Sequence, residues 1–259
     1  MRTPSARPAI FVTMPHSHYV EKARWALDRC GLAYREQPHV PLLHRRATQR
    51  HGGGSVPVLV DGGQRFVDST DILVHADARA GGDRLYPRDV ALRGEVLALE
   101  DRFDLHLGPH TRRWAYAHLL PEKRLLRTIM KRGVPLGEAM ALPILLPRVV
   151  RAIRKHLKIT PESALRSLVR VREMFHEVDE RLADGRRYLV LDRFTAADLT
   201  FAALAAPALF PAGYRGSYPA LDAVPEAMRE EVLRLRDTDA GRFALRMFEQ
   251  ERGVVVGAG

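Results

Sequence analysis

The segment from Ser55 to Ser69 constrains the fold more than any other part of the chain, because it has the pattern of a β-hairpin that leads directly into a helix. Its first half reads SVPVLV, and this run of β-branched and apolar residues predicts a buried strand. The turn is Asp61-Gly62-Gly63, and Arg65 to Val67 is predicted to be a short return strand. The hairpin therefore belongs to a sheet with at least one covered face.

Pro57 is an unusual residue near the head of this strand. It has no N–H to donate to a strand ladder, so it fits at a strand start, at an edge or in a special turn. A cis Val56-Pro57 bond would leave the backbone groups of Val56 open to a ligand, although only about 5% of X-Pro bonds in folded proteins are cis. After the hairpin, Asp68 or Ser69 is expected to cap a helix that begins near Thr70. The positive end of such a helix favours an anion.

Two motifs in this order resemble those of the cytosolic glutathione S-transferase superfamily. The first is the hairpin together with the preceding sequence MPHSHYVEKARWALDRCGL, and the second is LVLDRFTAADLTFAAL nearer the C-terminus. The resemblance covers Ala9 to about Tyr86 and Arg166 to about Pro207. It implies an α/β thioredoxin-like domain followed by an all-α helical-bundle domain, and it also implies a homodimer.

The residue patterns along the chain divide it in the same way. Residues 1–8 are expected to be a loose leader, and the strand and helix order over residues 9–86 predicts the α/β domain. Residues 89–252 are predicted to form the all-helical domain, with a basic inserted segment at 112–158. Residues 253–259 are a short tail.

Helical spacing predicts most of the helices. One runs from Ser17 to Cys30, with apolar residues on one face and Glu21, Arg24, Asp28 and Arg29 on the other. A long helix is expected from Val90 to Leu120, where Pro109 kinks or ends it, and at least one more around Pro147 to Leu157. The segment from Leu42 to Arg50 is either a short polar helix or a loop.

Thr195 is predicted to be the best helix N-cap in the chain. Its hydroxyl can bond the amide of Asp198, whose carboxylate can return the bond, while Phe194 and Leu199 form a hydrophobic staple. We assign this box to stability and not to chemistry. The run from Leu199 to Leu209 is so apolar that it predicts a buried helix.

Composition indicates a protein of the cytoplasm. The N-terminal sequence MRTPSARPAI has no apolar stretch of signal-peptide length, and the longest apolar run, from Ala139 to Pro147, is broken by Pro143. A single cysteine, Cys30, cannot form an internal disulfide and fits a reducing compartment.

The formal net charge of +10 comes entirely from the basic segment, which holds twelve Lys or Arg and two acids. Three interpretations are open. The segment can be a solvated helical face, or a surface for anionic lipid, because apolar residues adjoin Arg148, Arg151 and Lys155. Nucleic acid comes last, since no reading motif is present and only Trp114 and Tyr116 are available for stacking. We therefore expect no nucleic acid partner.

Ser17 is the candidate catalytic residue. It lies in the first turn of a predicted helix, where free amides and the helix dipole favour an anion, and its hydroxyl can donate to a thiolate and lower the pKa of the thiol. The resemblance implies this role towards the sulfur of glutathione. The simpler alternative, in which Ser17 only caps the helix, stays open.

The resemblance also implies the residues that hold glutathione, and it implies no metal. Asp68 and Ser69 match the pair that holds the γ-glutamyl end, through an acid for the ammonium and a hydroxyl plus helix amides for the carboxylate. Val56, before Pro57, would offer its backbone N–H and C=O to the cysteinyl part. For the remaining carboxylate, Arg50 and His51 are candidates by location only.

The chain also departs from the family pattern. His18 stands where the thiol-disulfide branches carry proline, and Ser17 replaces their cysteine, which argues against reduction through a mixed disulfide. His16 and His18 flank the serine and can act as bases, although surface histidines are the simpler interpretation. The inserted segment can close over, or replace, a hydrophobic substrate pocket.

Together these observations predict a glutathione S-transferase-like enzyme that conjugates glutathione to a small electrophile. The alternative is a non-catalytic binding protein of the same fold, peripheral to an anionic membrane through residues 112–158.

Overall fold

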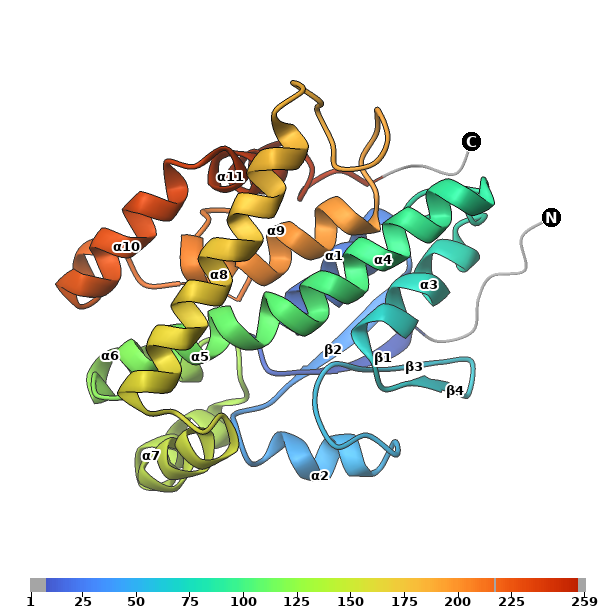
Figure 1. The fold of residues 1–259 in the computed structure, drawn as a ribbon. Coiled ribbons are helices and arrows are strands. Elements are labelled where there is room, and N and C mark those ends of the chain that lie inside the picture. Colours follow the sequence, from blue (N-terminus) through green and yellow to red (C-terminus); the bar gives the residue numbers. More distant parts are fainter. Residues whose placement is uncertain (1–7, 217, 256–259) are drawn as a thin grey trace.

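A computed structural model describes residues 8–216 and 218–255 (Figure 1). One four-stranded sheet has the order β2-β1-β3-β4. The strands are β1 (Ala9–Thr13), β2 (Tyr34–Pro38), β3 (Val58–Asp61) and β4 (Gln64–Phe66). Strand β1 runs parallel to β2 and antiparallel to β3, and β3 pairs antiparallel with β4. The predicted hairpin and the α/β thioredoxin-like arrangement are both confirmed.

Three helices accompany the sheet, namely α1 (His18–Arg29), α2 (His44–Gln49) and α3 (Ser69–Arg79). Helices α1 and α3 pack against each other, whereas α2 lies against β1. The N-caps are Ser17 for α1 and Asp68 for α3, as the sequence predicts. A side-chain cap therefore satisfies one free amide at the start of each helix.

The rest of the chain is helical, so the predicted fold class is confirmed. Its helices are α4 (Val90–His106), α5 (Gly108–Leu119), α6 (Lys123–Lys131), α7 (Leu136–His156), α8 (Pro161–Leu182), α9 (Ala196–Leu209), α10 (Glu226–Arg236) and α11 (Asp239–Gln250), with a 3-10 turn η1 (Leu221–Ala223). Helix α9 packs against α1, α4, α5, α10 and α11, and all of its residues are buried. The Asp198 carboxylate accepts a bond from the amide of Thr195 at 2.7 Å, which confirms the predicted box.

Two helix predictions are confirmed with more detail. The stretch from Val90 to Leu120 is two helices, because Pro109 falls in the first turn of α5 and the earlier helix ends before it. The helix expected around Pro147 to Leu157 is present and is longer, because α7 begins at Leu136 and contains Pro143 and Pro147. Both prolines lie on the exposed side of α7, where water can satisfy the carbonyl groups that they leave free.

Amphipathic spacing placed the charged residues of α1 opposite its apolar face, but this charged face is not a solvent-facing surface. Glu21, Arg24 and Arg29 are buried, because the helical domain covers that side of α1. Glu21 binds Arg252 at 2.6 Å, and Arg29 binds Glu251 at 3.0 Å. Arg24 pairs with Glu21 and with Glu36 of β2. These charges of α1 therefore pair with other side chains instead of with water.

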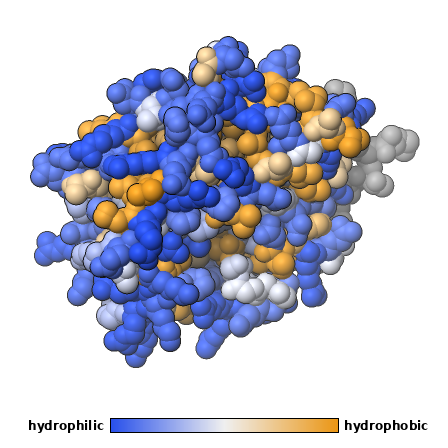
Figure 2. All heavy atoms as spheres, viewed as in Figure 1, coloured by the Kyte–Doolittle hydropathy of each residue, from blue (hydrophilic) through white to orange (hydrophobic). Residues whose placement is uncertain are grey.

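Apolar residues on the face shown in Figure 2 lie in groups among hydrophilic ones. No helix in residues 8–216 and 218–255 is long and apolar enough to cross a membrane. The predicted leader, apart from residue 8, and the last four residues of the predicted tail lie outside the described residues.

Candidate active site

Ser17 occupies the turn between β1 and α1, half-buried and with extended backbone angles. Its Oγ accepts a hydrogen bond from the amide of Val20 at 3.4 Å, which is long for such a bond. Among the described residues, the Ser17 hydroxyl hydrogen has no acceptor. A hydroxyl in this position can cap the helix and still donate its proton to a negatively charged ligand atom.

Two cavities meet at Ser17. The first, called here the apolar cavity, has an empty volume of about 630 Å³. It is lined mainly by apolar side chains from α5 and α6, among them Ala115, Leu119, Leu126, Ile129 and Met130. The second, called here the Val56 cavity, has an empty volume of about 840 Å³ and lies between residues 54–56, α2 and α7. Met14, Ser17, Arg112 and Tyr116 line both, so Ser17 belongs to the wall that the two cavities share.

The backbone of Val56 is available in the second cavity. The Val56-Pro57 peptide bond is cis, and the ladder between β1 and β3 includes only Val58, Leu59 and Val60. The N–H and C=O of Val56 thus lie outside the sheet pairing while the residue lines the cavity. An extended peptide can pair with such a free backbone.

Asp68 and Ser69 lie at the start of α3, outside the walls of both cavities. The exposed Asp68 accepts a hydrogen bond from the amide of Thr70 at 2.8 Å, as expected of an N-cap. Ser69 is buried, with 4% of its surface exposed. Capping by Asp68 is thus observed, whereas a ligand role for either residue stays a prediction.

Arg45 is a cavity residue that the sequence analysis missed. It lines the Val56 cavity, is exposed, and has no acidic partner in the described part of the chain. Arg50 and His51, the candidates chosen by location, follow the end of α2 and lie outside the walls of both cavities. The sequence left helix and loop open for Leu42 to Arg50, so it could not tell which arginine faces the cavity.

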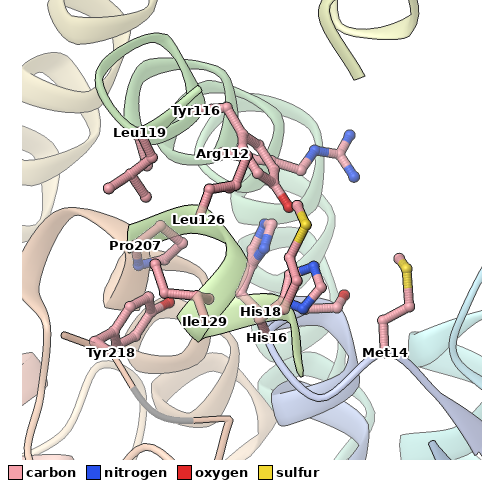
Figure 3. Close-up of a pocket in the computed structure, with 13 residues that line it drawn as sticks. Met14, His16, His18, Arg112, Tyr116, Leu119, Leu126, Ile129, Pro207 and Tyr218 are labelled. Atoms are coloured by element: carbon pink, nitrogen blue, oxygen red, sulfur yellow. The ribbon is translucent and has the colours of Figure 1, made fainter. Parts of the chain in front are cut away.

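Arg112 is the second missed residue. It projects from α5 into the walls of both cavities and pairs with no carboxylate among the residues described, and its Nε has no hydrogen-bond partner. Gly108, one turn earlier, lets Tyr19 of α1 approach α5 closely, because a Cβ there would overlap the hydroxyl of Tyr19. Figure 3 shows Arg112 and Tyr116 extending from α5 beside His16 and His18. An unpaired cation therefore lies on the same wall as Ser17.

The two histidines that flank Ser17 are not surface residues, contrary to the simpler interpretation. His18 is 3% exposed, its Nε2–H donates to the carbonyl of Gly108 at 3.0 Å, and burial and then Arg112 lower its pKa to about 3. Burial, with a smaller effect of His44, lowers the pKa of His16 to about 4. Neither ring nitrogen of His16 has a hydrogen-bond partner within the described ranges. His16 is thus a neutral polar group in the apolar cavity. His18, by contrast, already uses its Nε2–H in the hydrogen bond to the carbonyl of Gly108.

The basic segment forms the outer walls of both cavities. Its helix α6 supplies Leu126 and Ile129 to the apolar cavity, and α7 supplies Val149 and Ile153 to the Val56 cavity. Glu138 anchors α7, because its carboxylate accepts bonds from the ring of His39 at 2.6 Å and from the amide of Val40 at 2.8 Å. Residues 112–158 therefore close over the site with their inner faces.

Two family models match this chain. Residues 11–84 match the model described as glutathione S-transferase, N-terminal domain, and residues 139–230 match the glutathione S-transferase, C-terminal domain. A search of curated proteins gives no significant sequence match.

Solved structures share the fold over nearly the whole chain. The glutathione transferase GSTFuA3 from Phanerochaete chrysosporium is 18% identical with a TM-score of 0.61, and the match covers 98% of this chain and 100% of that one. The beta-etherase LigF from Sphingobium is 18% identical with a TM-score of 0.59, covering 95% and 100% of the two chains. A tau-class glutathione S-transferase from mango, Mangifera indica, is 12% identical with a TM-score of 0.52, covering 95% and 96%.

Proposed function

The chain belongs to the glutathione S-transferase superfamily, and from this premise we propose that it is an enzyme that conjugates glutathione to a small electrophile. The observation that carries the proposal is the place of Ser17 on the wall shared by two cavities, one lined mainly by apolar side chains and one that also holds Arg45 and the backbone of Val56. A polar peptide on one side and an apolar electrophile on the other would bring their reacting atoms together at Ser17.

In this proposal glutathione lies partly in the Val56 cavity and extends beyond its walls to the start of α3. The backbone of Val56, held by Pro57, pairs with the cysteinyl part, and the unpaired guanidinium of Arg45 binds the glycyl carboxylate. Asp68, with Ser69 at the start of α3, holds the γ-glutamyl end, where an exposed carboxylate suits an ammonium group. The roles of Arg45, Asp68 and Ser69 are chemically complementary to the ammonium group and the two carboxylates of the peptide.

The proposed chemistry is nucleophilic attack by the thiolate. The free Ser17 hydroxyl donates to the sulfur, and the positive charge of Arg112 together with the N-terminal end of α1 lowers the pKa of the bound thiol. The thiol releases its proton to solvent, and the resulting thiolate forms a carbon–sulfur bond with the electrophile in the apolar cavity while the leaving group departs with its bonding electrons. Tyr116, whose pKa burial raises to about 12, stays protonated and can donate a hydrogen bond to that group.

Kinetics of a matched pair of variants tests the role of Ser17. Ser17→Ala should lower kcat by about 10²-fold with little change in KM for glutathione, because the donor to the thiolate is lost while the groups that bind the rest of the peptide remain. Ser17→Thr keeps a hydroxyl and a helix cap and should retain most of the activity. Equal activity of wild type and Ser17→Ala would contradict the assigned role.

Calorimetry with glutathione separates the enzyme from its alternative. Binding in the millimolar range or tighter, with turnover of a model electrophile, supports the proposal. Binding without turnover would identify a non-catalytic member of the fold, and a lack of binding would remove glutathione as the co-substrate and leave the fold unchanged.

A further inference from the structure

The outer face of α7 carries an exposed apolar stripe that continues as a basic one. Leu136, Met140 and Ile144 are 76%, 70% and 74% exposed, and their spacing of four residues places them on one side of the helix. Arg148 and Lys155 are exposed and extend the same side towards the C-terminal end. Such exposure of three large apolar side chains in a row marks an interaction surface.

The charges near this stripe have no acidic partners. Eight exposed Lys and Arg lie on α6 and α7, and in the described part of the chain none forms an ion pair: Lys123, Arg124, Arg127, Lys131, Arg148, Arg151, Arg154 and Lys155. Of the two acids in the segment, Glu138 faces inward and is bonded to His39. The outer surface of the segment is therefore strongly positive, and its cations are free for an external anion.

Three kinds of partner can be compared on this surface. A second copy would bring two equally basic faces together, so charge repulsion opposes it. For nucleic acid, this surface offers neither Trp114 nor Tyr116 for stacking on bases, because Trp114 is 2% exposed and Tyr116 lines the cavities. An anionic membrane matches both halves of the stripe, since apolar side chains enter the acyl boundary while Lys and Arg pair with lipid headgroups.

We propose that the outer face of α7, supported by the cations of α6, binds the surface of an anionic membrane. The inner faces of the same helices line the two cavities, so lipid contact leaves these walls in place. This interaction does not depend on the proposed transferase activity.

Co-sedimentation of the full-length protein with vesicles tests the proposal. One vesicle contains phosphatidylcholine alone, and the other contains phosphatidylcholine and phosphatidylserine in equal parts. We expect binding only to the anionic vesicle, present at ~0.1 M salt and lost at ~1 M salt, where charge interactions are screened. Absence of binding to the anionic vesicle at the lower salt overturns the proposal.

Three sets of exposed substitutions locate the contact. Replacing Arg148, Arg151 and Lys155 together by Gln should reduce the partition coefficient on the order of a hundredfold. Replacing Leu136, Met140 and Ile144 by Ser should reduce it about tenfold or more at the same net charge. The control replaces by Gln three exposed cations away from α6 and α7, namely Arg35, Arg65 and Arg88. This control should leave binding unchanged.

The same variants give the outcomes that contradict the proposal. An equal loss in the control triple would show attraction by net charge alone, without a site. Binding of duplex RNA in the absence of vesicle binding would assign the surface to nucleic acid. A concentration-dependent dimer in sedimentation velocity that the Ser triple abolishes, again without vesicle binding, would assign it to a second copy.

Discussion

Lys22 and Glu100 form an ion pair of 2.9 Å in which neither side chain is exposed to solvent. The Lys22 ammonium also contacts Asp104 at 2.5 Å and the hydroxyl of Thr70 at 3.0 Å, so a single cation joins α1, α3 and α4. Burial lowers the pKa of Lys22, but the two carboxylates outweigh this effect and raise it. This charged cluster holds the helical domain on the helix that Ser17 caps.

Replacement of Lys22 by Met should lower the free energy of unfolding by about 3–5 kcal/mol, because two carboxylates lose their buried cation. Urea denaturation followed by circular dichroism measures the loss. Lys123→Met, which removes an exposed cation of α6, is the control and should change stability by less than about 0.5 kcal/mol. A Lys22→Met variant as stable as this control would show that the cluster contributes little.

Two substitutions of Asp68 separate ligand binding from helix capping. Asp68→Asn keeps an oxygen that accepts the bond from Thr70, but it removes the charge proposed to hold an ammonium group. We expect it to raise the KM for glutathione about tenfold with unchanged thermal stability. Asp68→Ala should also lose about 1 kcal/mol of stability, because the cap is gone. An Asp68→Asn variant with the wild-type KM would leave Asp68 as a cap alone.

Arg112 should control the pKa of the bound thiol. Its unpaired positive charge favours the thiolate over the thiol, so Arg112→Gln should shift the acid limb of the pH–kcat profile upward by about one pH unit. Ultraviolet absorbance of the bound thiolate gives the same pKa without turnover. Arg124→Gln, an exposed cation of α6 outside both cavity walls, should leave the profile in place. An identical acid limb in Arg112→Gln would remove this electrostatic role.

His18 should make the protein less stable in mild acid. Burial lowers its pKa to about 3 in the folded state, so between this value and its unfolded pKa of 6.5 the unfolded chain binds more protons. The contribution of the neutral His18 ring to the free energy of unfolding is thus complete above pH 6.5 and is lost as the pH falls towards 3. From pH 7 to pH 5 the loss from this one group is about 2 kcal/mol.

The variant His18→Gln keeps a side-chain N–H for the carbonyl of Gly108 but does not titrate. Its unfolding free energy should therefore fall by about 2 kcal/mol less than that of the wild type over the same pH range. Parallel urea titrations at the two pH values measure the difference. Equal pH slopes for the two proteins would mean that His18 is already charged in the folded state.

The sequence by itself determined the elements that depend on neighbouring residues. Apolar alternation, the glycine turn and the side-chain caps at Ser17, Asp68 and Thr195 act within a few residues, so the hairpin, α1, α3 and α9 could be predicted. The order of these elements also indicated the two-part fold. The candidate residues Ser17 and Val56 were found in this way, and both line the same cavity.

Only the tertiary structure decided what each side chain meets. Spacing placed Glu21 and Arg24 opposite the apolar face of α1, yet both are buried. Glu21 pairs with Arg252, and Arg24 pairs with Glu21 and with Glu36 of β2. Arg112 was counted only as part of the basic segment and Arg45 was not singled out, because only the packing of α2 and α5 brings them to the cavity walls. Periodicity reports which residues share a face, whereas partners far apart in the sequence determine whether that face contacts water, another charge or a ligand.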